Sequence, residues 1–167
     1  MKDETYPRPS DEYWMRRAIE EARHCVLPHP SSLISHPSQD VPIGAICVRD
    51  GEIIGRGHNR RELDGDPTAH AEVLALREAA QTIGSWRLDG VTLYVTLEPC
   101  PMCAGALWLS RVDRLLFGAW DEKAGACGSL FDIPRDPRLN HRLQVRGGVL
   151  EEECKTLLKE FFQQRRI

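Results

Sequence analysis

The sequence contains no apolar run long enough to cross a membrane, because no stretch approaches the ~20 consecutive apolar residues that a spanning helix needs. The N-terminal segment, Met-Lys-Asp-Glu-Thr-Tyr-Pro, also lacks the apolar core of a secretory signal peptide. We therefore expect a cytoplasmic protein with no membrane partner. In that compartment its six cysteines should stay reduced.

An excess of positive charge is also missing. The 22 lysine and arginine residues are outnumbered by 25 aspartate and glutamate residues, which gives a formal net charge of −3. The field of the whole molecule therefore offers no attraction to nucleic acid, and any nucleic-acid site must be a local basic patch. A solvated basic face would explain such a patch equally well. The candidate residues are Arg135, Arg138, Arg142, Arg146, Arg165 and Arg166.

The chain shows no internal repeat and no linker that would divide it. Its 167 residues fit one domain, and 41% hydrophobic residues are enough to bury a core. We predict a single domain over residues 1–167. Within it, residues 1–9 form a loose tail, and the proline- and serine-rich residues 26–39 form an extended loop.

The hydrophobic pattern predicts alternating helices and strands. Four helices are predicted. The first follows Ser10 and runs to Cys25, and the second begins at the candidate caps Asp66 and Thr68 and ends at Ile83. The third runs from the cysteine pair to Leu109, and the fourth covers 150–162. The predicted strands are 41–50, 53–58, 91–97, 112–119 and 141–146, and most of 120–140 should be loop. This order favours the α/β class, as a five-stranded mixed sheet covered by helices in three α/β/α layers.

The segment Thr-Leu-Glu-Pro-Cys-Pro-Met-Cys carries the strongest chemical signal. Cys100 and Cys103 lie three residues apart at the predicted start of a helix, so both sulfurs can face one metal ion. The positive end of the helix dipole there favours thiolates. Upstream lie His70 and Glu72. One imidazole and two thiolates give the ligand count of a catalytic zinc site, which keeps one position open.

A Cys-x-x-Cys pair alone is ambiguous, since redox pairs and structural zinc sites share it. A redox pair would leave His70 and Glu72 without a role. Together the four residues give the pattern H-x-E…P-C-x-x-C of zinc-dependent nucleobase deaminases, in which the glutamate shuttles protons. The four other cysteines, at positions 25, 47, 127 and 154, are predicted to be small core residues. The histidines at 24, 29, 36, 58 and 141 are predicted to be surface or hydrogen-bonding residues without a metal-ligand partner.

Over nearly its full length the sequence resembles the bacterial tRNA-specific adenosine deaminases, which belong to the cytidine-deaminase-like superfamily. The segments that carry the resemblance are 40–45, 57–60, 66–72, 93–106, 128–132, 140–142 and 157–162. The resemblance implies the cytidine-deaminase-like fold, a homodimer, and conversion of adenosine to inosine at the wobble position of a tRNA anticodon loop. Two departures stand out. The 26–39 loop is longer than the connection usual in the family, and Trp120 stands where members often have a basic residue.

The resemblance also implies residue roles. One Zn²⁺ per chain would be held by His70, Cys100 and Cys103, with Glu72 as the proton shuttle. The implied substrate contacts are Asn59 to the purine, Asp121 to the preceding ribose, and Asn140 and Phe161 to the anticodon loop. We expect the RNA-facing surface to include Arg142, Arg146, Arg165 and Arg166, together with Asp121, Asn140 and Trp120.

Simpler structural explanations stay open for several of these residues. Asn59 could be a turn residue, Asp121 a loop-capping carboxylate and Phe161 a core residue. Trp120 could stack on a base or fill a surface cleft. Glu98 is predicted to orient the turn at Pro99 and to have no catalytic part.

Two other functions compete with RNA deamination. A deaminase of a free base or nucleoside, such as guanine, cytosine or cytidine, would share the zinc chemistry but need neither a basic C-terminal surface nor exposed aromatic residues. A non-catalytic, zinc-stabilised module that binds RNA or protein would have no use for the Glu72 carboxylate.

Overall fold

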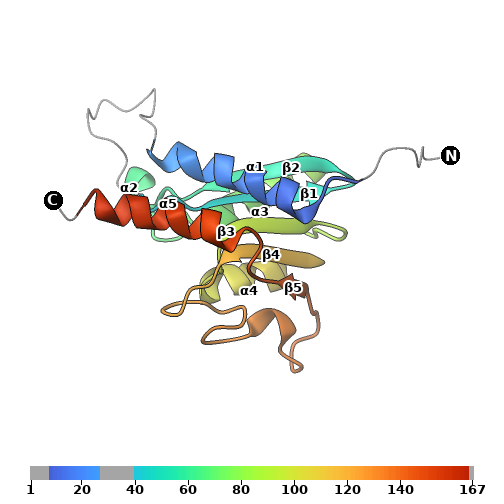
Figure 1. The fold of residues 1–167 in the computed structure, drawn as a ribbon. Helices are drawn as coiled ribbons and strands as arrows, with labels where there is room; N and C mark the ends of the chain where they lie inside the picture. Colours follow the sequence, from blue (N-terminus) through green and yellow to red (C-terminus); the bar gives the residue numbers. More distant parts are fainter. Residues whose placement is uncertain (1–7, 27–39, 166–167) are drawn as a thin grey trace.

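The computed structural model describes residues 8–26 and 40–165 (Figure 1). Most of the predicted tail (1–9) and of the predicted loop (26–39) lies outside the described residues. One five-stranded sheet has the order β2-β1-β3-β4-β5, which confirms the predicted mixed sheet. The strands are β1 (Gly44–Arg49), β2 (Glu52–His58), β3 (Thr92–Leu97), β4 (Arg114–Ala119) and β5 (Gln144–Arg146), shorter at several ends than predicted.

Both kinds of strand pairing occur in the sheet. β1 pairs antiparallel with β2 and with β3, whereas the β3–β4 and β4–β5 pairs are parallel. The hairpin between β1 and β2 turns at Asp50 and Gly51, whose φ angles of 52° and 78° suit the tight turns that join twisted strands. Leu97 lies beside Ala119, so β3 and β4 end at the same edge of the sheet.

Helices cover both faces of the sheet and give the predicted three layers. α1 and α5 lie side by side on one face, where they share a core cluster with β1, β3 and β4 (Figure 1). α3 and α4 pack with the opposite face. The helices are α1 (Asp11–Arg23), η1 (His24–Val26), α2 (Arg61–Asp64), α3 (Ala71–Ile83), α4 (Pro101–Leu109), η2 (Ile133–Arg135) and α5 (Glu151–Gln163). The four cysteines predicted for the core, at 25, 47, 127 and 154, are all buried.

The start of α3 differs from the prediction. Asp66 does not cap this helix, because its carboxylate accepts hydrogen bonds from the Thr68 N–H (2.8 Å) and hydroxyl (2.7 Å) in a local turn. The helix begins after that turn, with His70 in an extended conformation at its N-cap (φ −80°, ψ 150°). The short helix α2, which was not predicted, precedes the turn.

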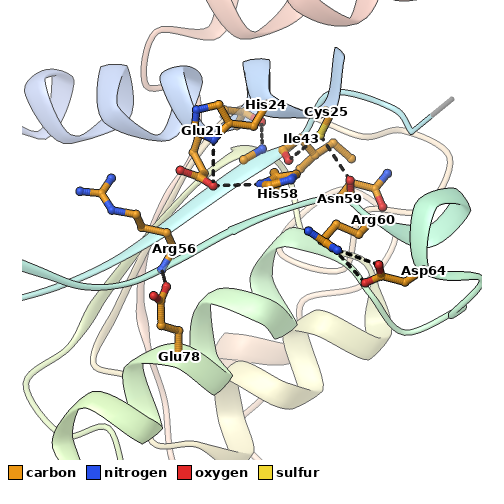
Figure 2. A network of polar contacts seen from close by, with 12 residues as sticks. Glu21, His24, Cys25, Ile43, Arg56, His58, Asn59, Arg60, Asp64 and Glu78 are labelled. Atoms are coloured by element: carbon orange, nitrogen blue, oxygen red, sulfur yellow. Dashed lines mark hydrogen bonds and ion pairs between the residues drawn. The ribbon is translucent and has the colours of Figure 1, made fainter. Parts of the chain in front are cut away.

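α3 lies unusually close to β2. A Cβ atom at Gly57 would overlap the backbone carbonyl of Ala71, so only glycine allows this approach. Side chains of α3 also bind backbone groups of β2. The Arg56 N–H donates to the Glu78 carboxylate (Figure 2). The Ile54 carbonyl accepts a hydrogen bond from the Thr82 hydroxyl at 2.7 Å. These contacts fix the N-terminus of α3 beside the end of β2. Among the described helices, none has the length and apolar character to span a bilayer.

Candidate active site

Two helix N-termini bring the predicted metal ligands together. His70 is the N-cap residue of α3, Cys100 is the N-cap residue of α4, and Cys103 lies in the first turn of α4. The Nδ1 atom of His70 lies 3.6 Å from the Cys100 Sγ and 3.5 Å from the Cys103 Sγ. The ligand atoms of the three residues all lie within 4.8 Å of one another.

This spacing fits a tetrahedral transition-metal ion. Zinc–sulfur bonds of about 2.3 Å and zinc–nitrogen bonds of about 2.0–2.1 Å place a nitrogen and a sulfur ligand roughly 3.5 Å apart. The two measured distances, 3.6 and 3.5 Å, agree with that value. Three protein ligands would leave one coordination position open, as catalytic zinc sites require.

The electrostatics of the cluster favour a cation. The hydrogen bond from Cys103 lowers the pKa of Cys100 to about 4, against the effect of burial, and His70 contributes in the same direction. The same hydrogen bond, together with burial, raises the pKa of Cys103. The hydrogen bond with Cys100 raises the pKa of His70. A thiolate at Cys100 would attract a metal cation.

Glu72 lies one residue into α3 and is only 4% exposed. Burial raises the pKa of its carboxyl group to about 7, although a backbone N–H opposes this shift. The carboxyl lines a cavity of about 270 Å³ that also includes His70 and Cys100. This volume is slightly below the ~300–1,000 Å³ typical of ligand pockets, so the cavity suits a small ligand.

Comparison with known proteins identifies the chemistry of this arrangement. The family model described as MafB19-like deaminase matches residues 11–166. A curated tRNA-specific adenosine deaminase of Bacillus subtilis (strain 168) is 49% identical over 156 residues, which cover 93% of this chain and 91% of that protein. The chain belongs to the tRNA-specific adenosine deaminase family.

Solved structures agree with this family assignment and with the predicted cytidine-deaminase-like fold. A structure from a study of A-to-I editing by tRNA:A34 deaminases has a TM-score of 0.76 and 40% identity, covering 86% of this chain and 97% of its own. A guanine deaminase from Nitrosomonas europaea has a TM-score of 0.72 but only 26% identity, covering 94% and 88%. The resemblance predicted from the sequence is confirmed.

Two of the substrate contacts that the family resemblance implied, Asn59 and Asp121, line the cavity. Both also have the structural roles that the sequence left open. The Asn59 amide donates to the Val41 carbonyl (3.1 Å) and accepts from the Arg61 N–H (3.3 Å). The Asp121 carboxylate accepts from the N–H groups of Lys123 (3.0 Å) and Ala124 (3.2 Å). These bonds hold both side chains in the wall of the cavity.

The other two implied contacts lie outside the cavity lining. Asn140 is exposed on the segment after η2. Phe161 is buried, and the Arg165 guanidinium stacks 4.1 Å from the centre of its ring. The neighbouring Phe162 is 49% exposed, so Phe162 is the aromatic residue of this pair that a ligand could reach. Trp120 is partly exposed and packs edge-to-face on Phe117, with ring centres 4.8 Å apart.

Three arginines of the candidate basic patches, at 135, 138 and 146, form ion pairs with acidic side chains of this chain. Arg146 pairs with Asp11 (3.0 Å) and Glu12 (3.6 Å) at the N-terminal end of α1. The cavity lies near the opposite end of that helix, where Cys25 bonds to Asn59. Arg146 therefore does not belong to the RNA-facing surface that we propose. Arg135 and Arg138 pair with neighbouring aspartates, and Arg142 is exposed. Arg166 lies outside the described residues.

The structure shows instead a basic groove beside α5, which we call the α5 groove. Its lining residues are Lys123, Leu158, Lys159, Phe162, Gln163 and Arg165. Sequence reasoning missed Lys123, Lys159 and Phe162. Positions 158, 162 and 165 follow helical spacing, which could have indicated that they share a face.

Glu98 has a different role from the predicted one. It is only 2% exposed, and its carboxylate accepts hydrogen bonds from the N–H groups of Asp121 (2.9 Å), Cys127 (3.2 Å) and Ser129 (2.9 Å), and from the Ser129 hydroxyl. Glu98 therefore anchors the loop after β4 to the end of β3. This loop supplies Asp121 and Ala124 to the wall of the cavity.

We expect Glu98→Gln to loosen the cavity wall. A glutamine amide would turn an N–H donor toward a group of N–H donors, and each lost bond to a buried charge costs about 1.5–3 kcal/mol. The melting temperature should fall and the KM for an RNA substrate should rise, while the zinc content stays unchanged. Glu122→Gln, on the exposed part of the same loop, is the matched control. Unchanged melting and KM would refute the anchoring role.

Proposed function

We propose that this protein hydrolytically deaminates adenosine to inosine at the wobble position of a tRNA anticodon. The observation that carries the proposal is the cluster of His70, Cys100 and Cys103 beside the buried carboxyl of Glu72, in a cavity of about 270 Å³. The reaction replaces the C6 amine of adenine by oxygen, consumes water and releases ammonia. The similarity to tRNA-specific adenosine deaminases supports this substrate.

His70, Cys100 and Cys103 would hold one Zn²⁺ per chain. When bound, zinc makes water available as a nucleophile at neutral pH through Lewis-acid polarisation. The side chains that would hold it lie at two helix N-termini, where the helix dipole favours the thiolate form of the cysteines.

Glu72 would move the protons of the reaction. Its carboxylate would accept one proton from the attacking water and pass it to N1 of the purine. It would then accept the second proton of that water, from the new C6 hydroxyl, and pass it to the amine, which leaves as ammonia. A single carboxyl can do this in sequence because it lines the same cavity as His70 and Cys100. Its burial keeps bulk water from competing for these protons.

From the cavity wall, Asn59 would contact the target purine and Asp121 the ribose that precedes it. Asn140 and Phe161 would lie toward the anticodon loop. The α5 groove would hold the flanking RNA through the cations of Lys123, Lys159 and Arg165 and through the exposed ring of Phe162. A base must leave its stack to enter the cavity, and this costs least in a single-stranded loop.

The α5 groove also separates the proposal from its alternatives. A deaminase of free guanine, cytosine or cytidine needs no cationic and aromatic groove outside its cavity. A zinc-stabilised binding module needs no buried carboxyl beside the metal ligands, because such a group costs free energy to bury. Neither alternative accounts for both features.

Comparison of substrates tests the function directly. We expect inosine formation on an anticodon stem-loop with adenosine at the wobble position, and much slower ammonia release from free adenosine, guanine, cytosine or cytidine. Mass spectrometry of the RNA and an ammonia assay measure the two. Efficient turnover of a free base alone would replace the proposal with the small-molecule deaminase.

The role of the α5 groove predicts a change in salt dependence. Each phosphate contact to a single strand contributes about −0.7 to the log–log slope of affinity against salt. Lys159→Ala with Arg165→Ala should therefore weaken stem-loop binding and flatten the slope. Phe162→Ala should weaken binding with little change of slope, because stacking contributes ~1–3 kcal/mol per base. Trp120→Ala should do the same if that ring stacks on a base. Unaltered binding in both the Lys159→Ala/Arg165→Ala variant and the Phe162→Ala variant would show that the groove is a solvated face.

We also propose a cytoplasmic homodimer, since tRNA is processed in the cytoplasm and the family resemblance implies a dimer. An apolar hollow between α3 and α4 supports the dimer. Its lining includes Val73, Leu76, Trp86 and Leu109, of which Trp86 is 65% and Leu109 59% exposed. Exposed apolar area of this kind marks association sites. A monomeric mass by sedimentation at assay concentration would contradict the dimer.

A further inference from the structure

A second group of potential metal ligands lies between α1 and β2, apart from the candidate active site. Glu21 and His24 lie three residues apart on α1 and its C-cap, and His58 is the last residue of β2 (Figure 2). Their ligand atoms all lie within 4.8 Å of one another. This finding corrects the prediction that His24 and His58 have no metal-ligand partner.

The geometry of the three groups is already close to that of a metal site. The Glu21 Oε1 atom lies 2.9 Å from Nδ1 of His58 and 3.5 Å from Nδ1 of His24. Metal bonds of about 2.0–2.2 Å to nitrogen and oxygen separate neighbouring ligand atoms by roughly 2.9–3.5 Å. Both imidazoles therefore face the same carboxylate oxygen. Their distances from it already match the distances between neighbouring ligand atoms around a metal ion.

Burial is graded across the group. The Glu21 side chain is 9% exposed, that of His58 19% and that of His24 53%. The carboxylate is thus held inside the protein, while the side of His24 remains open for an ion and its water ligands to enter. Burial alone would raise the pKa of Glu21, but the hydrogen bond from His58 and the charge of His24 lower it below its usual value, so the carboxylate form prevails.

We propose that Glu21, His24 and His58 form a second metal site, which binds a divalent transition-metal ion such as Zn²⁺ or Ni²⁺. The two imidazoles select such ions, and zinc also accepts a carboxylate oxygen. Ca²⁺ and Mg²⁺ are disfavoured, because they take oxygen ligands and the group offers only one carboxylate. With three protein ligands, water completes the coordination. The site contains no thiolate, which distinguishes it from the cluster of His70, Cys100 and Cys103.

The position of the site gives it a structural consequence for the cavity. His58 directly precedes Asn59, a residue of the cavity wall. Cys25, next to His24, donates from its thiol to the carbonyls of Asn59 (3.4 Å) and Ile43 (3.7 Å) (Figure 2). A bound ion would therefore fix the C-terminal end of α1 to the end of β2, where both support the wall of the cavity.

Metal uptake by the intact protein tests the proposal. Protein that carries one zinc per chain is titrated with Zn²⁺, and in a separate experiment with Ni²⁺, by calorimetry, followed by elemental analysis after gel filtration. We expect a second equivalent to bind and the melting temperature to rise with metal concentration. His24→Gln and His58→Gln should each weaken the second equivalent by at least about tenfold without loss of the first.

Two control variants separate this site from other histidines. His141→Gln removes an imidazole that bonds to the Val112 carbonyl (2.8 Å), and it should leave the second equivalent intact. A variant with His29→Gln and His36→Gln tests the imidazoles outside the described residues. The proposal is overturned if no second equivalent binds, or if uptake survives in both His24→Gln and His58→Gln. Because His24 is largely exposed, its variant should fold and keep the test decisive.

Discussion

Replacing Glu72 by alanine is expected to lower turnover of an anticodon stem-loop by ~10²- to 10⁴-fold, the usual contribution of a positioned acid–base group. Zinc content and RNA affinity should remain close to those of the wild type, since Glu72 is not part of the cluster of His70, Cys100 and Cys103 and the α5 groove, where we propose that RNA binds, lies elsewhere. Single-turnover kinetics, elemental analysis and stem-loop binding measure the three quantities separately. This pattern would identify Glu72 as the proton carrier.

Other outcomes for Glu72 have distinct meanings. Activity within tenfold of the wild type would rule out the assignment. Loss of zinc would show instead that the carboxyl is a ligand or supports one. Glu122→Gln removes an exposed carboxylate from the loop after β4 and should behave as the wild type in all three measurements.

Removing one metal ligand should have an equally large effect, by a different route. Cys103→Ala leaves only His70 and Cys100, which are too few to hold zinc at a catalytic site. We expect zinc to fall from about one per chain to well below that value, and deamination to fall with it. The melting temperature should also drop, because Cys103 is buried and the bound ion stabilises the folded state.

The matched control is Cys47→Ala, which removes a thiol that is equally buried but lies in β1. This variant should lose some packing and melt earlier, while it keeps both zinc and activity. A metal-free wild-type protein that still deaminates would contradict the assignment of the cluster, whatever the behaviour of the two variants.

The candidate site could be predicted where its residues depend on local sequence. Pro99 and the Cys-x-x-Cys spacing at the start of an apolar helix indicate that two sulfurs face one side, and α4 has that geometry. His70 was placed at a helix start for a partly wrong reason. The prediction used Asp66 and Thr68 as caps, but the helix begins at Ala71, so that His70 itself is the N-cap residue.

Contacts between distant segments could not be predicted in the same way. The approach of Glu21 to His58 spans 37 residues, and that of Arg146 to Asp11 spans 135. Both depend on the packing of α1 across the sheet, for which the residues themselves carry no local signal. The four hydrogen bonds that Glu98 accepts depend likewise on the path of a loop that follows another strand.

The binding of α3 side chains to the backbone of β2 has a consequence for how copies of the chain can associate. A free sheet edge is a template on which a strand from another molecule can add, and this is a common route to aggregation. At the β2 edge, the Arg56 N–H and the Ile54 carbonyl are already engaged by Glu78 and Thr82. The opposite edge, β5, is only three residues long and offers little template. Growth of the sheet from one chain into the next is therefore disfavoured at both edges, which favours helical surfaces for ordered assembly.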